Sequence, residues 1–131
     1  METKYNEATL NRPKGERILD APFVFTDIKK FSKQLKEEKA WKKNDRNGIT
    51  FYKSADLTMV LTWLHEGAVI MDNLAAGLIS IQVLQGSVDF TVQHDGRTRL
   101  EKKQIVTIHA GVMHTICAME DTLLLIITKG E

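Results

Sequence analysis

The sequence has little of what marks secreted or membrane-embedded proteins. It contains one cysteine and two prolines among its 131 residues. The single cysteine, Cys117, excludes a disulfide within the chain and fits a reducing compartment. No apolar run approaches the ~20 residues that a membrane-spanning helix needs. The N-terminus also lacks the charged-then-apolar pattern of a signal peptide. We therefore expect a cytoplasmic protein with no membrane partner.

The chain also lacks a charge excess of either sign. Lys and Arg number 18 against 17 Asp and Glu, which gives a net charge of +1. Whole-chain charge therefore gives no reason to expect a nucleic-acid or acidic-membrane partner. Basic residues do gather between positions 29 and 46, but no aromatic platform or nucleic-acid motif accompanies them. We expect a solvated helix face there and no nucleic-acid partner.

Length and composition favour one structural domain overall. A chain of 131 residues with 43% hydrophobic content suits one core and leaves little room for a second. Within this domain we distinguish an N-terminal arm (1–26), a helix with a linker (27–47) and a β-rich segment (48–131). The arm is polar and could add an edge strand.

The helix is predicted from residue 27 to about residue 39. Ile28, Phe31 and Leu35 recur at helical spacing, which indicates one apolar face. Thr26 offers an N-cap, and Asp27 is then favourably placed in the first turn.

From residue 48 onward the apolar residues alternate with polar ones, which is typical of strands. Gly86 and the Asp95-Gly96 pair supply turns between them. Strands are predicted at 49–53, 57–65, around 79–83, around 88–92, and at 104–109, 114–119 and 122–128. This pattern of short strands at near-regular spacing predicts an all-β barrel or sandwich.

A second pattern is the spacing of three glycines and one histidine. Gly67-x5-Asn73-x-Ala75-x3-Ile79-x6-Gly86 is followed by Gly111-Val-Met-His114. This spacing resembles the two signature motifs of the cupin superfamily, G-x5-H-x-H-x3-E-x6-G and G-x5-P-x-G-x2-H-x3-N. The resemblance implies that residues 48–131 form a double-stranded β-helix, or jelly-roll, barrel with the helix packed outside. Lys103, His109 and Ala118 stand where the second motif normally has Gly, Pro and Asn.

The same resemblance bears on the metal site. A typical cupin holds a divalent transition metal inside the barrel with three imidazoles and a carboxylate. Here Ala75 and Ile79 have no donor atom, and the amide of Asn73 is a poor ligand for such an ion. His114 is the one usual ligand that remains. We therefore expect no cofactor, and a divalent transition metal is disfavoured.

A relocated metal site is a second hypothesis. Asp72 is adjacent to Asn73, His109 lies five residues before His114, and His65 stands near the start of the first motif. His65, Asp72, His109 and His114 form a conceivable substitute ligand set, although nothing in the spacing requires it.

The residues that the resemblance places inside the barrel are mainly apolar. Ile79, Ile81 and Val83 would line a cavity in which Asn73 and His114 are the polar anchors. Such a lining suits a small organic molecule, and it equally suits a filled core. We favour a metal-free cupin that binds or senses a small molecule and expect no catalytic residue, because no acid/base pair or activated nucleophile can be assembled.

Two further readings stay open. One is a metal-dependent cupin enzyme, an oxygenase or isomerase, that uses the relocated ligands. The other is a structural dimerisation module. Because cupins commonly pair through their sheets, the resemblance also implies a homodimer.

Overall fold

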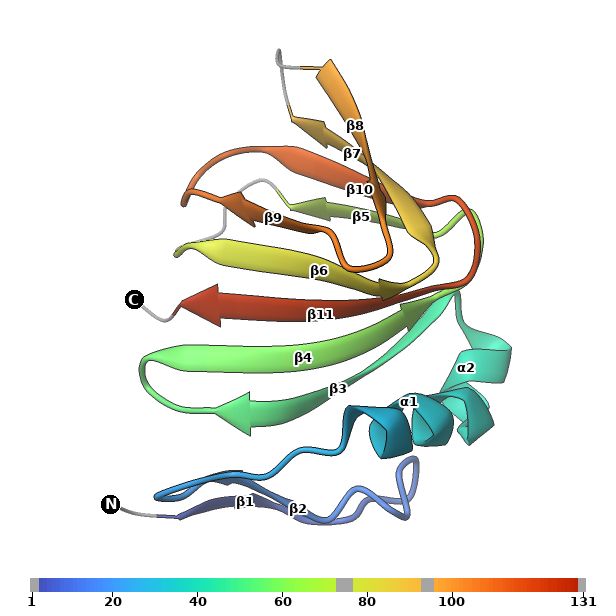
Figure 1. Ribbon diagram of the computed structural model, residues 1–131. Coiled ribbons are helices and arrows are strands. Elements are labelled where there is room, and N and C mark those ends of the chain that lie inside the picture. The colour runs from blue at the N-terminus through green and yellow to red at the C-terminus, as the bar shows by residue number, and fades with distance from the viewer. Residues whose placement is uncertain (1–2, 73–76, 93–95, 130–131) are drawn as a thin grey trace.

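The structure is a computed structural model that describes residues 3–72, 77–92 and 96–129, and only the backbone of Asp72. Figure 1 shows its elements. In chain order they are β1 (Lys4–Asn6), β2 (Arg17–Asp20), α1 (Ile28–Glu37), α2 (Lys39–Lys43), β3 (Arg46–Lys53), β4 (Leu57–Leu64), β5 (Val69–Asp72), β6 (Ile79–Gln85), β7 (Ser87–Val92), β8 (Gly96–Glu101), β9 (Ile105–Ile108), β10 (His114–Ala118) and β11 (Thr122–Lys129).

Most strands belong to two antiparallel sheets that face each other (Figure 1). The larger sheet has the order β3-β4-β11-β6-β9, and the smaller one has the order β5-β10-β7-β8. Several neighbours in these orders are far apart in sequence, as where β11 lies between β4 and β6. The expected all-β class is confirmed.

Two apolar clusters hold these layers together. The first fills the space between the two sheets, and the second lies between the helices and the outer face of the larger sheet. Alternation along β4 explains the division, because Leu64 belongs to the first cluster while Leu61 and Trp63 belong to the second. The inner cluster comprises Leu64, Ala68, Ile79, Ile81, Val83, Val88, Phe90, Leu100, Ile108, Ile116, Ala118 and Leu124.

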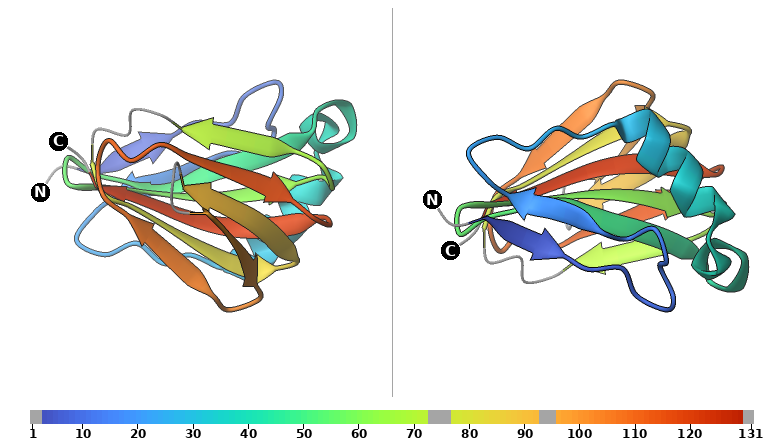
Figure 2. Two further views of the ribbon diagram at one scale, coloured as in Figure 1. Left: turned by 90° about the horizontal axis from the view of Figure 1, so that it is seen from above. Right: turned by 90° about the horizontal axis from the view of Figure 1, so that it is seen from below.

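The N-terminal arm folds back on itself. β1 and β2 pair with each other as a separate two-stranded sheet instead of adding an edge strand to the barrel. Seen from below, this hairpin and the helices lie across the β3 side of the larger sheet (Figure 2). The arm is therefore packed against the barrel through β2 and β3.

The helix begins one residue later than predicted. The side chain of Asp27, not that of Thr26, caps α1 by accepting a hydrogen bond of 3.0 Å from the amide of Lys30. Asp27 has the extended backbone that an N-cap needs, and its carboxylate also favours the positive end of the helix. α1 ends at Glu37, and a short second helix, α2, carries Trp41 into the outer cluster.

Two strands of the barrel, β5 and β8, were not predicted. In β5 apolar residues stand on both faces, and Val69 and Met71 are 42% and 68% exposed, so no alternation is visible. β8 is an edge strand of the smaller sheet in which Leu100 alone is buried. Both strands are positioned by their neighbours in the sheet rather than by their own pattern.

The glycines of the motif occupy positions where the backbone turns. Gly86 has a φ of +91°, and a Cβ there would lie 2.5 Å from the hydroxyl of Thr122. Gly67 and Gly111 also have positive φ. Lys103, which stands where the second motif has glycine, adopts a φ of +74°, so the turn keeps its shape without the usual residue.

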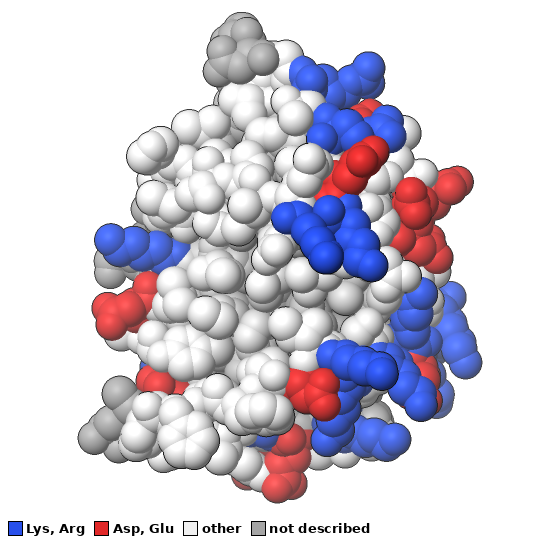
Figure 3. Space-filling model, viewed as in Figure 1, with Lys and Arg blue, Asp and Glu red and all other residues white. Residues whose placement is uncertain are grey.

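The basic stretch lies on the surface of the two helices. Figure 3 shows basic side chains gathered on the side of the molecule where α1 and α2 lie. Every lysine of both helices is exposed: Lys29, Lys30, Lys33, Lys36, Lys39, Lys42 and Lys43. Within the described ranges neither helix is long and apolar enough to cross a membrane.

Candidate functional site

His114 is the first residue of β10, in the middle of the smaller sheet. Its Cα pairs with Asp72 of β5 on one side and with Val92 of β7 on the other. Because side chains alternate along the strand, His114 faces the interior together with Ile116 and Ala118, and only 4% of its surface is exposed. The interior position expected from the resemblance is therefore the position that His114 has.

Two neighbours orient the His114 ring. Its Nδ1 lies 3.0 Å from the carbonyl oxygen of Val112, and its ring centroid is 6.0 Å from that of Phe90. A carbonyl only accepts, so Nδ1 carries the proton in this hydrogen bond. In the neutral ring, Nε2 is then an acceptor, and no hydrogen bond to it is found among the described residues.

The exposure of the interior side chains changes along the barrel. We call the two ends the His114 end and the Ala118 end, after the first and last residues of β10. Near the Ala118 end the interior side chains, such as Val88 and Leu124, are completely buried. Three apolar side chains toward the His114 end are only partly buried. They are Val92, which pairs with His114, Val112, two residues before it, and Ile70, which pairs with Ile116. The interior is thus filled at one end and more accessible at the other.

The three predicted cavity residues on β6 lie in this interior. Ile79, Ile81 and Val83 are 5%, 2% and 0% exposed and belong to the inner cluster. Ile79 opens β6 and pairs with Ile108, so it lies at the His114 end. Because these side chains are close-packed, a ligand would meet them only at the edge of the packed region, next to His114.

The remaining predicted anchors and motif residues, Asn73 and Ala75, lie outside the described residues. The side chain of Asp72, one member of the substitute ligand set, lies outside them too. His109 follows β9 and is exposed.

His65 has a different setting. Its ring stacks on that of Trp41, with centroids 3.4 Å apart and planes 11° from parallel. Its Nε2 lies 2.7 Å from the carbonyl oxygen of Trp41, and its Nδ1 lies 3.9 Å from a carboxylate oxygen of Asp121. These contacts tie the turn after β4 to α2, which is a structural role.

The substitute ligand set does not converge. His65 is in the turn whose Gly67 amide donates to the carbonyl of Ala118 over 2.8 Å, so it lies at the Ala118 end. His114 lies four residues away along β10, which is ~13 Å at the usual rise of ~3.3 Å per residue. Two imidazoles that far apart cannot bind one ion. Among the described residues no group of three or more His, Cys, Asp or Glu could hold a metal ion.

Comparison with known proteins identifies the fold. No protein-family model matches the sequence, and no curated protein matches it closely enough to count as a relative. Solved structures do match. A cupin superfamily protein from Desulfitobacterium hafniense shares 19% identity at a TM-score of 0.62, over 67% of this chain and 80% of the other.

Two further neighbours have assigned roles. A salicylate 1,2-dioxygenase from Pseudaminobacter salicylatoxidans shares 17% identity at a TM-score of 0.58, over 64% of this chain and 26% of the other. A transcriptional regulator of the HTH_3 family from Vibrio cholerae shares 17% identity at a TM-score of 0.58, over 66% of this chain and 52% of the other. The chain is thus a jelly-roll barrel with the fold of the cupin superfamily. At this identity the likeness concerns the fold alone, which hosts both enzymes and regulators.

Proposed function

We propose that this protein is a metal-free cupin that binds a small organic molecule at the His114 end of its barrel. The observation that carries the proposal is one buried imidazole beside partly buried apolar side chains, at the end where the interior is less completely filled. Ligand sites in proteins typically combine an apolar lining with a few placed polar groups. Val92 and Ile70 provide the lining, and His114 provides the polar group.

The geometry of His114 restricts the chemistry of the ligand. With Nδ1–H directed to the Val112 carbonyl, the neutral ring offers Nε2 as an acceptor. A ligand with a hydroxyl, amide or other N–H donor fits that acceptor, and its apolar body fits the lining. A binding or sensing role is favoured over catalysis, because His114 is the one buried titratable side chain among the described residues of the barrel strands.

The neighbours support a sensing role only indirectly. One of them is a transcriptional regulator, in which a barrel of this fold belongs to a control protein. Another is a dioxygenase. The position that carries a carboxylate in the usual cupin motif is here Ile79, packed in the inner cluster, and this supports the proposal of a metal-free barrel.

Metal analysis tests the metal-free part of the proposal. Tag-free protein purified without chelator is expected to contain well under one equivalent of Fe, Mn, Ni or Zn per chain. About one equivalent in the wild-type protein, lost in a His114→Ala variant, would overturn it.

Ligand screening by thermal shift tests the binding part. A ligand that binds only the folded state at 100 times its Kd stabilises that state by about 2.7 kcal/mol, so hits from a metabolite panel raise the midpoint measurably. We expect the shift to disappear in His114→Gln and to persist in His109→Ala, which changes an exposed histidine nearby. Equal shifts in both variants, or no hit from a broad panel, would contradict a site at His114.

A further inference from the structure

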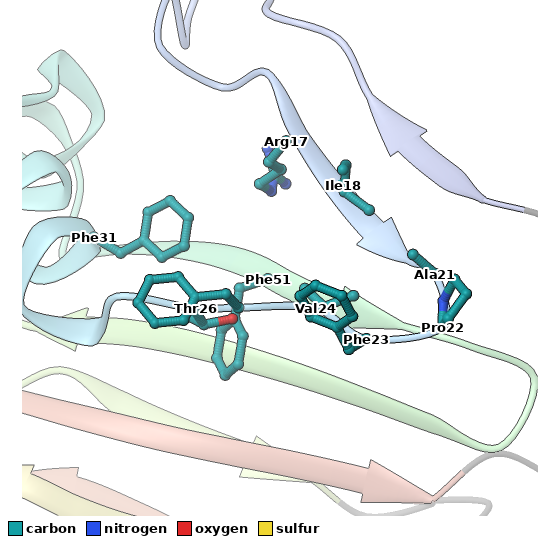
Figure 4. A pocket seen from close by; sticks show the side chains of 10 residues that line it. Arg17, Ile18, Ala21, Pro22, Phe23, Val24, Thr26, Phe31 and Phe51 are labelled. Carbon is teal, nitrogen blue, oxygen red and sulfur yellow. The ribbon is translucent and has the colours of Figure 1, made fainter.

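A pocket lies outside the barrel, where the arm meets the helix. It has a volume of about 460 Å³, within the usual range for small-molecule sites. Figure 4 shows it between β2, the segment that follows β2, and α1. It is lined by Arg17, Ile18, Ala21, Pro22, Phe23, Val24, Phe25, Thr26, Phe31 and Phe51.

Aromatic rings dominate this pocket. Phe51 is buried in the outer cluster and Phe31 packs against it from α1. Phe23 and Phe25, by contrast, are 83% and 85% exposed. Two phenylalanines left in water next to an apolar hollow mark a surface that gains free energy when an apolar group covers it.

Arg17 is the one charged residue in this lining. Its guanidinium is held in place, since Nε donates to the carbonyl of Thr50 over 2.6 Å and Nη1 donates to the carbonyl of Gly15 over 2.5 Å. Among the described residues, no hydrogen bond from Nη2 is found and no carboxylate forms an ion pair with Arg17. The nearby Glu38 is instead paired with Arg12.

The electrostatics of Arg17 match this geometry. Burial is the largest cause that lowers the pKa of Arg17, the charge of Arg12 lowers it further, and Glu38 opposes both. An arginine nevertheless stays charged. A partly buried cation is stabilised by an anion brought to it, and a carboxylate matches the planar guanidinium.

We propose that this pocket binds a small organic acid with an aromatic or branched aliphatic body. Its carboxylate lies against the guanidinium of Arg17, and its apolar body lies on Phe31 and Phe51. Phe23 and Phe25 then lie over the ligand and lose their exposure to water. This site is separate from His114 and does not depend on ligand binding in the barrel.

The test uses 3-phenylpropionate and the matched neutral probe 3-phenylpropionamide. Both are titrated into the full chain, and amide chemical shifts in ¹H–¹⁵N spectra are followed. We expect the acid to shift the resonances of Ile18, Phe25 and Phe31, and to bind about tenfold or more tightly than the amide, because the amide forgoes the charged pair. The same shifts are expected in His114→Gln, which separates this site from the barrel site.

Three variants complete the test. Arg17→Gln is expected to bind the acid about as weakly as wild type binds the amide. Because Arg17 also ties backbone segments together, Phe25→Ser is the second variant, which changes an exposed side chain and should weaken both probes. Arg97→Gln, at an exposed arginine on β8, should change neither.

Equal affinity for acid and amide would overturn the proposal, as would no binding of either probe to wild type. A further contrary result is concentration-dependent self-association by sedimentation that Phe25→Ser abolishes while neither probe binds. The surface would then be covered by a second copy of the chain.

Discussion

Arg12 and Glu38 join the arm to the body of the protein. Arg12 Nε lies 3.1 Å from both carboxylate oxygens of Glu38, and both side chains are largely buried. The same guanidinium donates through Nη2 to the carbonyl of Gly48 over 2.7 Å. Asn47 completes the network, because its amide donates to Glu38 and to the carbonyl of Leu35. One ion pair thus connects the arm, the break between the helices and the start of the barrel.

Arg12→Ala tests this connection. Removing the guanidinium leaves a largely buried carboxylate without its charged partner, and we expect a loss of about 2–4 kcal/mol in the free energy of unfolding. Urea denaturation measures the loss. Arg97→Ala is the matched control, since Arg97 is 71% exposed and Asp89 keeps its closer pair with Arg99, so a loss of less than about 1 kcal/mol is expected. Equal effects of the two substitutions would show that Arg12 is not an anchor.

The pH dependence of stability offers a second prediction, at Glu38. Burial by itself raises the pKa of Glu38, but hydrogen bonds from Arg12, Asn47 and Gln34, with the charge of Arg12, outweigh it and hold the pKa below the usual range. The folded state then binds fewer protons than the unfolded state near the ordinary glutamate pKa of about 4.3. The stability that the ionised Glu38 contributes is therefore fully present above the ordinary glutamate pKa. It is lost as the pH falls through the lower pKa that Glu38 has in the folded state.

This contribution is measured by comparing the free energies of unfolding of wild type and Glu38→Gln between about pH 3 and pH 6. We expect the wild type to lose more stability than the variant as the pH falls. Parallel curves would contradict the assignment.

The left-handed backbone of Lys103 supplies a third prediction. A φ of +74° disfavours any side chain with a Cβ, by about 1–2 kcal/mol, and glycine avoids that strain. Lys103→Gly should therefore raise the free energy of unfolding by up to about 1 kcal/mol, once the greater freedom of the unfolded glycine is subtracted. Lys102→Gly, in the same turn, should lower it. Thermal or chemical denaturation of both variants measures these changes. A loss of stability in Lys103→Gly would contradict the claim that the backbone of Lys103 is strained.

Gly86 and Gly67 form a matched pair for a fourth prediction. Both have positive φ, but a Cβ at Gly86 would lie 2.5 Å from the Thr122 hydroxyl and 2.6 Å from the Asp121 carbonyl, whereas none of the described atoms lies within 4 Å of one at Gly67. Gly67→Ala should lower the free energy of unfolding by only about 1–2 kcal/mol, the cost of a positive φ in a residue with a Cβ. Gly86→Ala adds a collision with backbone and should cost at least about 1 kcal/mol more. Equal losses in denaturation experiments would indicate that the β6–β7 turn relaxes freely.

Some elements were predictable because their own residues carry the pattern. In β6 and β7 the inward positions Ile79, Ile81, Val83, Val88, Phe90 and Val92 are all apolar and most residues between them are polar, so a period of two is visible in each. β5 and β8 carry no such pattern. β8 pairs with β7 at an edge and β5 pairs with β10, so in each case the partner strand supplies the order.

The candidate site was predictable in part for the same reason. The resemblance placed His114 and Ile79 in the barrel interior, and both side chains are buried there. Spacing could not show that His65 lies at the opposite end, because two histidines far apart in sequence are positioned by how β4 and β10 are arranged in the barrel. It also could not show the stack of His65 on Trp41.

The sequence alone thus determined the all-β class and the absence of donor atoms at Ile79 and Ala75, because periodicity and side-chain chemistry can be read from the residues themselves. Only the tertiary structure decided which apolar side chains stay exposed to water and which charged groups lie without an ion-pair partner in the described residues. Arg17, Phe31 and Phe51 belong to three separate segments, and none is unusual by itself. Their meeting leaves a guanidinium beside an apolar hollow, since burial and ion pairing depend on contacts between residues distant in the chain.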